Sequence, residues 1–322
     1  MLLVIGAGAV GGFYASKYDD QQIALVCRSN YESIQAQQGI YIHSRYEPAR
    51  LFKPFKIYSS ISDTLNDFYN VILIATKSFV DLTLDLKPLY DSSDQPRTLL
   101  LIQNGIDIEQ KYAQAFPKWC ILTCSTTISC AQTKPGEIHH YKWTRISIGP
   151  FATKYVNEEQ GLVNAHEIKR RFTRGGIPDA FVYSSIDIQR VRWHKLIINA
   201  AVSPTSILSG GLGTSEIAAD PLLLEHLRQC MLEIKNAGEI ILKTSFPESW
   251  GTVDAILNSI KTNTGSKPSM LLDWEENRPL ELNEIVGNLL IRAKEAKLNL
   301  VRVECMFQLL QSQLKCRRKA KL

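Results

Sequence analysis

The chain has 322 residues, of which 45% are hydrophobic and 21% are charged, and this composition is typical of a globular protein long enough for two hydrophobic cores. A formal net charge of +5 is too small to indicate nucleic-acid binding, and no apolar run reaches the ~18 residues of a membrane span. The composition therefore predicts neither nucleic acid nor membrane as a partner, and the mild positive charge suits an anionic small molecule.

Seven cysteines are scattered along the chain without a C-x-x-C pair, so neither a zinc site nor a disulfide framework is predicted. His194 and the pair His139 and His140 have no matching set of ligands, and we expect them to be structural, with no metal bound. Because the first apolar strand begins at Leu2, no signal peptide is expected, and the protein is predicted to be cytoplasmic, in a reducing compartment.

The first dozen residues combine an apolar run with a glycine-rich turn. Residues 2–5 are typical of a strand buried on both faces of a parallel sheet, and G-x-G-x-x-G follows before a helical segment. Gly6 would allow the tight turn, Gly8 the approach of a pyrophosphate, and Gly11 the close packing of the helix. The predicted cofactor-binding residues here are Gly6, Ala7, Gly8, Ala9, Val10 and Gly11. The alternative is a glycine-rich turn without a ligand.

The residues after the second strand predict which dinucleotide is bound. An NAD-specific site usually has an acidic residue at the end of this strand, where it binds the ribose 2′-hydroxyl. Here the strand 23–27 is followed by Arg28 and Ser29, which can pair with and donate to a 2′-phosphate. We therefore expect NADPH rather than NADH, with Arg28 in the cofactor site. The alternative is that Arg28 is a solvated loop cation.

Strands and helices alternate along the first part of the chain. Apolar runs at 71–76, 98–103 and 121–129 predict further strands of a doubly wound α/β sheet. The other elements expected are a helix at 31–37, an irregular or hairpin-like segment at 40–58, a helix from 79 toward 86, short strands at 137–141 and 145–149, a helix at 158–174 and a strand at 181–183. Beyond residue 185 apolar residues recur at helical spacing. The fold class is therefore α/β: an N-terminal Rossmann-type, NADP-binding domain, 1–185, followed by an all-helical substrate and catalytic domain, 186–322.

Polar residues that follow strands directly are candidates for the site. Lys77 and Asn104 each come after an apolar run, and ligands of doubly wound sheets bind at the carboxyl ends of the strands. We expect both beside the cofactor. The alternatives are a solvated loop cation for Lys77 and a turn residue for Asn104, which precedes a glycine.

Two segments of the helical part carry further candidates. Lys195 and Asn199 are four residues apart, so on a helix they share a face, and burial there would lower the pKa of Lys195. The alternative for Lys195 is a side chain that snorkels out of a buried helix. Further on, Ser269 or Asp273 could cap a turn, and Glu281 is expected in the first turn of the next helix, where a carboxylate suits the dipole.

Taken together, these motifs resemble the ketopantoate reductase (2-dehydropantoate 2-reductase) family over nearly the whole chain. The motifs are the glycine triplet, Thr76-Lys77-Ser78, Gln103-Asn104-Gly105, Trp193-x-Lys195-Leu-x-x-Asn199, and Ser269-Met-x-x-Asp273 followed by Glu281. The resemblance implies NADPH-dependent reduction of 2-dehydropantoate (ketopantoate) to pantoate in pantothenate (coenzyme A) biosynthesis.

The same resemblance implies the roles of the site residues. Lys195 would be the general acid that protonates the ketone oxygen, and Glu281 would orient the substrate and the lysine. The remaining implied site residues are Asn104 and Asn199 at the substrate or nicotinamide, Ser269 at the substrate carboxylate, and Lys77 beside the cofactor.

The chain departs from the family pattern at two positions. Many members have Asn where this chain has Ser203, before Pro204, and a further Asn where it has Gly213. Two substrate-side amides are thus replaced, which leaves two alternatives open: reduction of another 2-keto acid on the same fold, and a non-catalytic NADPH-binding regulator. The oligomeric state is also open, with a homodimer as one candidate.

Overall fold

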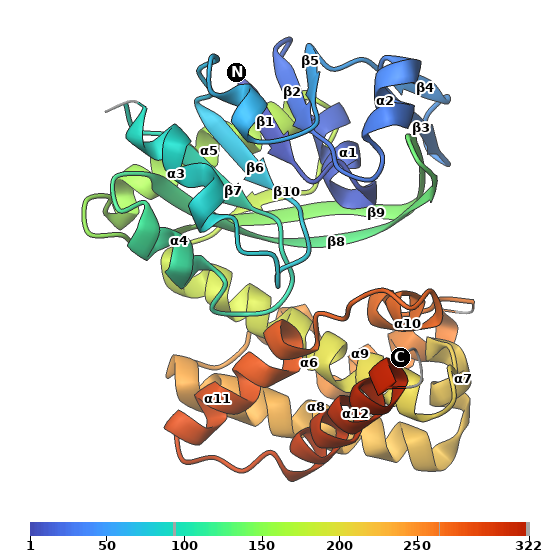
Figure 1. Ribbon diagram of the computed structural model, residues 1–322. Coiled ribbons are helices and arrows are strands. Elements are labelled where there is room, and N and C mark those ends of the chain that lie inside the picture. The colour runs from blue at the N-terminus through green and yellow to red at the C-terminus, as the bar shows by residue number, and fades with distance from the viewer. Residues whose placement is uncertain (93–94, 264, 320–322) are drawn as a thin grey trace. The chain divides into compact units, whose positions relative to one another are not determined.

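The computed structural model describes residues 1–92, 95–263 and 265–319, and contacts within the chain divide it into two compact units (Figure 1). The first unit comprises Met1–Gln103 and Ile108–Ile188. The second comprises Asn104–Asp107 and the chain from Gln189 onward. Among the described residues, no helix combines the length and the apolar character needed to cross a membrane.

Within its described residues, the first unit is built on one sheet of ten strands. The strands are β1 (Leu2–Ile5), β2 (Ile23–Val26), β3 (Ile40–Ser44), β4 (Arg50–Phe52), β5 (Lys56–Tyr58), β6 (Val71–Ile74), β7 (Thr98–Leu101), β8 (Cys120–Lys134), β9 (Glu137–Phe151) and β10 (Ala180–Val182). Their order is β4-β3-β9-β8-β7-β6-β1-β2-β5, with β10 beside β9. The strands β2, β1, β6, β7 and β8 pair in parallel, and the short apolar runs among them are buried because helices cover both faces.

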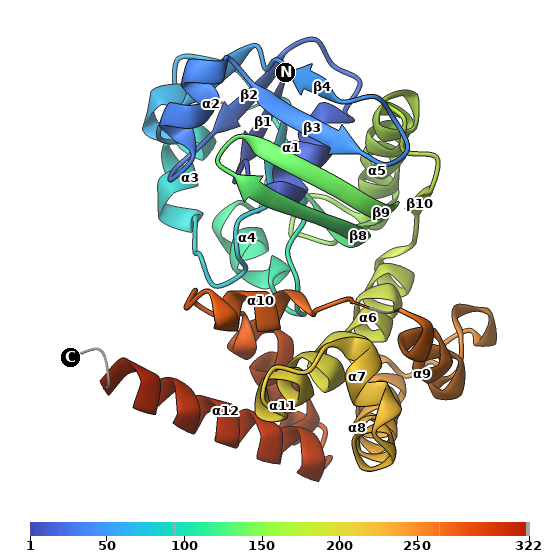
Figure 2. The same ribbon diagram turned by 90° about the vertical axis from the view of Figure 1, so that its right-hand side faces the viewer.

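The helices of the first unit form a layer on each face of the sheet (Figures 1 and 2). They are α1 (Ala9–Ser16), α2 (Tyr31–Gln37), α3 (Thr83–Asp91), α4 (Glu109–Ala115), α5 (Glu158–Arg174) and the 3₁₀ turn η1 (Ser62–Thr64). Leu2 and Val4 of β1 belong to a core with Phe13 of α1 and Phe172 of α5. The alternate residues Leu3 and Ile5 belong to a second core with helices α3 and α4. The predicted doubly wound, Rossmann-type sheet is therefore confirmed.

The strands β8 and β9 differ from the prediction. The sequence predicted an end near Ser129 and two short strands in place of β9, whereas the structure has two continuous antiparallel strands. The register passes from Ile128 opposite Thr144 to Ser129 opposite Lys142, which leaves Trp143 as an extra residue with a positive φ of 56°. A β-bulge absorbs this residue, and so the strand continues through a break in the polar–apolar pattern.

Two other segments refine the prediction. The helix expected from residue 79 begins instead at Thr83, where the Asp81 carboxylate accepts a hydrogen bond from the Thr83 backbone N–H at 3.0 Å. Residues 79–82 therefore form the entry to α3 and not its first turn. The segment 40–58 contains the antiparallel hairpin β3–β4, and its last part, β5, pairs in parallel with β2.

The second unit is helical throughout its described part. Its elements are α6 (Ser185–Leu208), which begins in the first unit, α7 (Thr214–Ala219), α8 (Pro221–Leu242), the 3₁₀ turn η2 (Glu248–Trp250), α9 (Val253–Thr262), α10 (Ser269–Glu275), the π-helical turn η3 (Asn283–Gly287), α11 (Asn288–Glu295) and α12 (Val301–Lys319). One core joins Trp193 of α6, Met231 of α8, Leu289 of α11 and Val303 of α12. The predicted all-helical C-terminal region is therefore confirmed.

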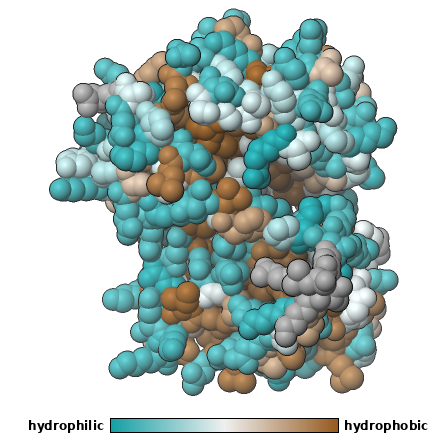
Figure 3. Space-filling model, viewed as in Figure 1, coloured by the Kyte–Doolittle hydropathy of each residue, from teal (hydrophilic) through white to brown (hydrophobic). Residues whose placement is uncertain are grey.

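The surface of the second unit is mainly hydrophilic on the face that Figure 3 shows, with hydrophobic side chains at separate points. Exposed hydrophobic residues of this unit include Leu222, Val301 and Leu309. Single exposed apolar side chains of this kind are common on protein surfaces.

Candidate active site

The glycine loop after β1 is packed so closely that two of its residues have no room for a side chain. Gly6 has a φ of +99°, and a Cβ on it would lie 2.8 Å from the Thr76 backbone nitrogen. A Cβ on Gly11 would lie 2.1 Å from the Gly6 carbonyl oxygen and 2.9 Å from Ala75 Cβ. The loop and the first turn of α1 therefore rest against the end of β6, and only glycine fits at these positions.

Gly8 differs, because a Cβ added there would meet nothing within 4 Å. It has an extended backbone and is the N-cap of α1, the helix end at which the first N–H groups have no partner within the helix. The buried Asn30 side chain holds the loop by donating a hydrogen bond from Nδ2 to the Ala7 carbonyl oxygen at 2.7 Å. An open space at a helix N-terminus fits a pyrophosphate, so residues 6–11 could hold a dinucleotide.

The other predicted cofactor residues of the first unit also follow strands. Arg28 is exposed just beyond β2, next to the exposed Ser29. Lys77 is half-buried after β6. The buried Gln103 links the ends of two strands, because its Nε2 donates to the Thr76 carbonyl oxygen at 3.1 Å and to the Lys77 carbonyl oxygen at 3.3 Å. These residues therefore lie at the carboxyl ends of the strands, the edge at which doubly wound sheets bind ligands.

Asn104 belongs by its contacts to the second unit, although it follows β7 of the first. The next residue, Gly105, has a φ of +90°, and a Cβ on it would lie 2.2 Å from the Glu284 carbonyl oxygen. Ile106 is 1% exposed and belongs to the helical core. The loop Asn104–Asp107 is therefore packed against the π-helical turn η3, and Gly105 is required for that approach.

Side chains of the second unit also hold this loop. Arg192 of α6 donates to the Gly105 carbonyl oxygen, and Asn288 donates from Nδ2 to the Ile106 carbonyl oxygen at 2.8 Å. Arg292 of α11 binds the Asp107 carboxylate through two hydrogen bonds, each 2.8 Å long. A bidentate arginine–carboxylate pair fixes orientation as well as distance, so the position of Asn104 is tightly defined.

Lys195, Asn104 and Glu281 form one hydrogen-bonded chain. The Lys195 ammonium donates to Asn104 Oδ1 at 3.0 Å, and Asn104 Nδ2 donates to Glu281 Oε2 at 3.2 Å. Glu281 is 4% exposed, and an acidic group this buried needs partners of this kind. The asparagine amide thus connects an ammonium group to a carboxylate.

The surroundings of Lys195 favour loss of its proton. Its pKa is lowered to about 8, first because burial disfavours the charged ammonium and second because the Arg192 guanidinium carries the same charge. The Glu281 carboxylate acts in the opposite direction and raises the pKa. A lysine in this state is able to donate a proton near neutral pH and to recover it from solvent.

Three further residues that the sequence analysis singled out in the helical region are placed as follows. Asn199 lies one turn after Lys195 on α6, as the spacing predicts. Ser269 is exposed at the first residue of α10 and does not cap it, because the N-cap is Pro268. Asp273 is buried and accepts a hydrogen bond from Arg278 Nε at 2.8 Å, which joins the end of α10 to the following loop.

Glu281 is not in the first helical turn, as the sequence predicted, but lies directly before the first helical residue, Leu282. Its backbone carbonyl accepts the Ile285 N–H, and its side chain reaches Asn104. The helix begins later than expected, and its next residues form the π-helical turn η3, whose wider winding was not visible in the sequence.

Sequence reasoning missed Arg192, Asn30 and the pair of Asp107 and Arg292. Arg192 could have been found, because it lies three residues before Lys195 and so shares a face of the helix with it. The contact of Arg292 with Asp107 joins residues 185 positions apart, and no local pattern predicts it.

Ser203 and Gly213, the two positions where a departure from the family pattern was expected, lie in different settings. Ser203 is 4% exposed on α6, two turns beyond Lys195. Gly213 is the N-cap of α7, and its N–H donates to the Glu216 carboxylate at 2.6 Å.

A doubly wound sheet with this glycine loop, followed by a helical unit that carries a lysine of lowered pKa, defines a nicotinamide-dependent oxidoreductase. Two family models match the chain: "Ketopantoate reductase PanE/ApbA" over residues 2–153 and "Ketopantoate reductase PanE/ApbA C terminal" over residues 187–313. Together they cover most of the sequence. The chain belongs to the ketopantoate reductase family.

Individual relatives agree with this assignment. The chain is similar to a 2-dehydropantoate 2-reductase of Nostoc sp., with 26% identity over 96% of this chain and 93% of that protein. The crystal structure of 2-dehydropantoate 2-reductase from Methylococcus capsulatus has a TM-score of 0.81 at 29% identity, and the match covers 98% of this chain and 97% of that one. The fold is also that of a D-mandelate dehydrogenase solved with NADH and anilino(oxo)acetate, with a TM-score of 0.76 at 16% identity over 97% of this chain and 98% of that one.

Proposed function

We propose that this protein reduces a 2-keto acid to a 2-hydroxy acid with NADPH, and that the substrate is ketopantoate, which becomes pantoate in pantothenate biosynthesis. The observation that carries this proposal is the chain from Lys195 through Asn104 to Glu281, together with a Lys195 pKa of about 8. Reduction of a ketone needs a proton donor at the carbonyl oxygen, and a lysine positioned in this way supplies one.

The proposed mechanism divides the work between cofactor and protein. The bound nicotinamide supplies the hydride that adds to the carbonyl carbon. The charged Lys195 stabilises the negative charge that develops on the carbonyl oxygen and then donates its proton from Nζ to that oxygen. Asn104 restrains the ammonium, and Glu281 favours its charged form. We assign Asn199 to contact with the substrate or nicotinamide and Ser269 to the substrate carboxylate.

We assign the cofactor to the first unit. Its pyrophosphate would lie at residues 6–11, where Gly8 leaves open space, and we also assign Lys77 and Asn104 to cofactor binding. The exposed Arg28 has no acidic residue beside it at the end of β2, which favours a 2′-phosphate and hence NADPH. In this assignment residues 1–185 form the NADP-binding domain and residues 186–322 the substrate and catalytic domain.

Reduction of a different 2-keto acid is the second candidate, and Ser203 and Gly213 favour it because they replace amides on the substrate side. The D-mandelate dehydrogenase with a similar fold was solved with NADH and an aromatic oxo acid analogue. Both the substrate and the dinucleotide therefore need a direct comparison.

The test is steady-state oxidation of NADPH and of NADH with ketopantoate and with other branched and aromatic 2-keto acids. The proposal predicts the highest kcat/KM for NADPH with ketopantoate. Arg28→Ala should weaken the binding of NADPH more than that of NADH. Arg174 is an exposed arginine on α5, and Arg174→Ala should leave the preference for NADPH unchanged. A higher kcat/KM with another acid would favour the second candidate, and binding of NADPH without turnover of any acid would favour a non-catalytic regulator.

We also propose a homodimer in a reducing, cytoplasmic compartment. A ketopantoate reductase of Staphylococcus aureus with a similar fold is described as dimeric, with a TM-score of 0.73 at 19% identity. All seven cysteines of this chain are free, as a reducing compartment requires. Light scattering after size-exclusion chromatography would determine the mass in solution, and a monomer would contradict the proposed dimer.

A further inference from the structure

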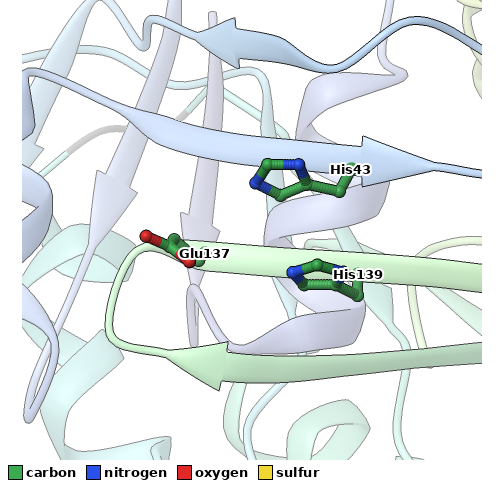
Figure 4. A group of neighbouring side chains, drawn as sticks. All are labelled: His43, Glu137 and His139. Carbon is green, nitrogen blue, oxygen red and sulfur yellow. The ribbon is translucent and has the colours of Figure 1, made fainter.

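Three potential metal ligands lie together near one edge of the sheet in the first unit (Figure 4). His43 comes from β3, and Glu137 and His139 come from β9. The two strands are parallel neighbours, and His43 lies directly opposite His139. Because residues 137 and 139 are two apart on one strand, all three side chains project from the same face.

The three side chains converge. One ligand atom from each of them lies within 4.8 Å of those of the other two. The imidazole rings are stacked, with centroids 4.5 Å apart and planes inclined by 16°. Figure 4 shows a nitrogen of each ring on the side of the Glu137 carboxylate. All three residues are partly exposed, so an ion can reach them from solvent.

We propose that His43, Glu137 and His139 bind a divalent transition-metal ion, with Zn²⁺ as the ion that the ligands fit. Two imidazoles and one carboxylate form a donor set that suits Zn²⁺, whereas Mg²⁺ and Ca²⁺ prefer oxygen ligands alone. Tetrahedral zinc with bonds of about 2.0–2.1 Å places its ligand atoms about 3.4 Å apart. The nearly parallel rings must therefore tilt toward each other when the ion binds, and the fourth position is left to water.

The proposed ion would link the hairpin β3–β4 to β9, its neighbour in the sheet. The hairpin β3–β4 is at the end of the strand order and meets the rest of the sheet through β9. An ion shared by His43 and the two β9 residues would hold this hairpin in place. Binding to the folded form alone raises stability by mass action, so the protein should melt at a higher temperature when the ion is bound.

Lys134 competes with the ion for the Glu137 carboxylate. Lys134 Nζ lies 3.9 Å from Glu137 Oε2, but the Lys134 side chain is 74% exposed. An exposed pair of this length contributes little, so the ion can displace the ammonium. The proposed site uses none of the residues assigned to cofactor or catalysis and is independent of the proposed reaction.

The experiment uses the full chain without a histidine tag, freed of metal with a chelator and then dialysed. Titration calorimetry with ZnCl₂ should show one ion bound per chain. His43→Ala and His139→Ala should each weaken binding at least about tenfold, and Glu137→Gln should weaken it while keeping the side-chain shape. His166→Ala is the matched control, because His166 is an exposed histidine on α5.

Thermal melting gives a second readout that does not depend on activity. ZnCl₂ should raise Tm of the native protein and of His166→Ala, and should not raise Tm of His139→Ala. A melting transition without metal would show that a variant folds. If a histidine variant does not fold, Glu137→Gln provides an independent test. The proposal is overturned if the native protein binds no Zn²⁺, or if His139→Ala and Glu137→Gln bind it as tightly as His166→Ala does.

Discussion

The Lys195 ammonium donates a hydrogen bond to the side-chain oxygen of Asn104 at 3.0 Å, although the two residues are 91 positions apart in the chain. This contact exists because the loop Asn104–Asp107 packs with the helical unit and not with the sheet that precedes it. The Asn104 side chain in turn donates a hydrogen bond from Nδ2 to Glu281 Oε2. Position and charge of the proposed proton donor therefore depend on side chains from three separate segments.

The pH dependence of the reaction should report the proton on Lys195. The protonated form is the one that donates, so kcat/KM for reduction should fall as pH rises through about 8, the pKa of this group. Arg192 lowers that pKa, so Arg192→Gln should move the basic limb to higher pH. Arg190→Gln, which removes an arginine of the same helix that contacts Ser245, is the control and should leave the limb in place. A limb that does not move in Arg192→Gln would remove Arg192 from this role.

Glu281→Gln separates a role in the site from a role at the helix start. A carboxylate near a helix N-terminus contributes ~0.3–1 kcal/mol to stability and nothing to chemistry. As a site residue, Glu281 raises the pKa of Lys195, so its neutral replacement should move the basic limb to lower pH and reduce kcat/KM strongly, with a small change in Tm. Glu276→Gln, an exposed glutamate five residues earlier, should change neither. Unaltered kcat/KM in Glu281→Gln would exclude Glu281 from the site.

Gly105→Ala tests the packing that positions Asn104. Gly105 and Gly210 both have a positive φ, +90° and +87°, so alanine is strained at either position. At Gly105 the added Cβ would also lie 2.2 Å from the Glu284 carbonyl oxygen, whereas at Gly210 it would meet nothing within 4 Å. In urea denaturation, Gly105→Ala should lose at least ~1 kcal/mol more free energy of unfolding than Gly210→Ala, and only Gly105→Ala should lower kcat. Equal losses would mean that the loop is not held by this approach.

Alanine substitutions at Gly8 and Gly11 should affect different properties: NADPH affinity at Gly8 and thermal stability at Gly11. Gly8→Ala places a methyl group in open space, so Tm should change little while the Kd for NADPH rises, because the methyl group occupies the region assigned to the pyrophosphate. Gly11→Ala places a Cβ 2.1 Å from the Gly6 carbonyl oxygen and should lower Tm. Calorimetric melting and NADPH titration of both variants check this. Unchanged NADPH affinity in Gly8→Ala would contradict the assignment of the loop.

Much of the fold could be predicted from the sequence, because many of its strands, turns and helices depend on residues that are close together in the chain. The apolar run 2–5 and the three glycines after it predicted a strand, a turn and a helix, and Gly6 and Gly11 are packed as that pattern requires. The helical spacing after residue 185 likewise predicted a helical region. Periodicity could not reveal the bulge at Trp143, because one extra residue disturbs the alternation without ending the strand.

The candidate site was less predictable because it depends on contacts between distant segments. Lys195 and Asn199 follow from helical spacing, but the partners of Lys195 come from the loop at Asn104 and from Glu281. The cluster of His43 with His139 is similar, since strand pairing brings together residues that are far apart in the chain. Pairing and docking of this kind are set by tertiary packing, which a single sequence does not display.

The most direct test of the account is the kcat of Lys195→Ala measured together with its Kd for NADPH. General acid catalysis contributes ~10²- to 10⁴-fold, so kcat for reduction of the best 2-keto acid should fall by at least that factor. NADPH should bind nearly as to the native protein, because the residues assigned to its pyrophosphate and 2′-phosphate are the glycine loop and Arg28, and Lys195 contacts neither group in this assignment. Lys261→Ala, an exposed lysine on α9, is the control and should keep full activity. A Lys195→Ala protein that retains most of its kcat, or that loses NADPH binding in parallel with kcat, would contradict the account.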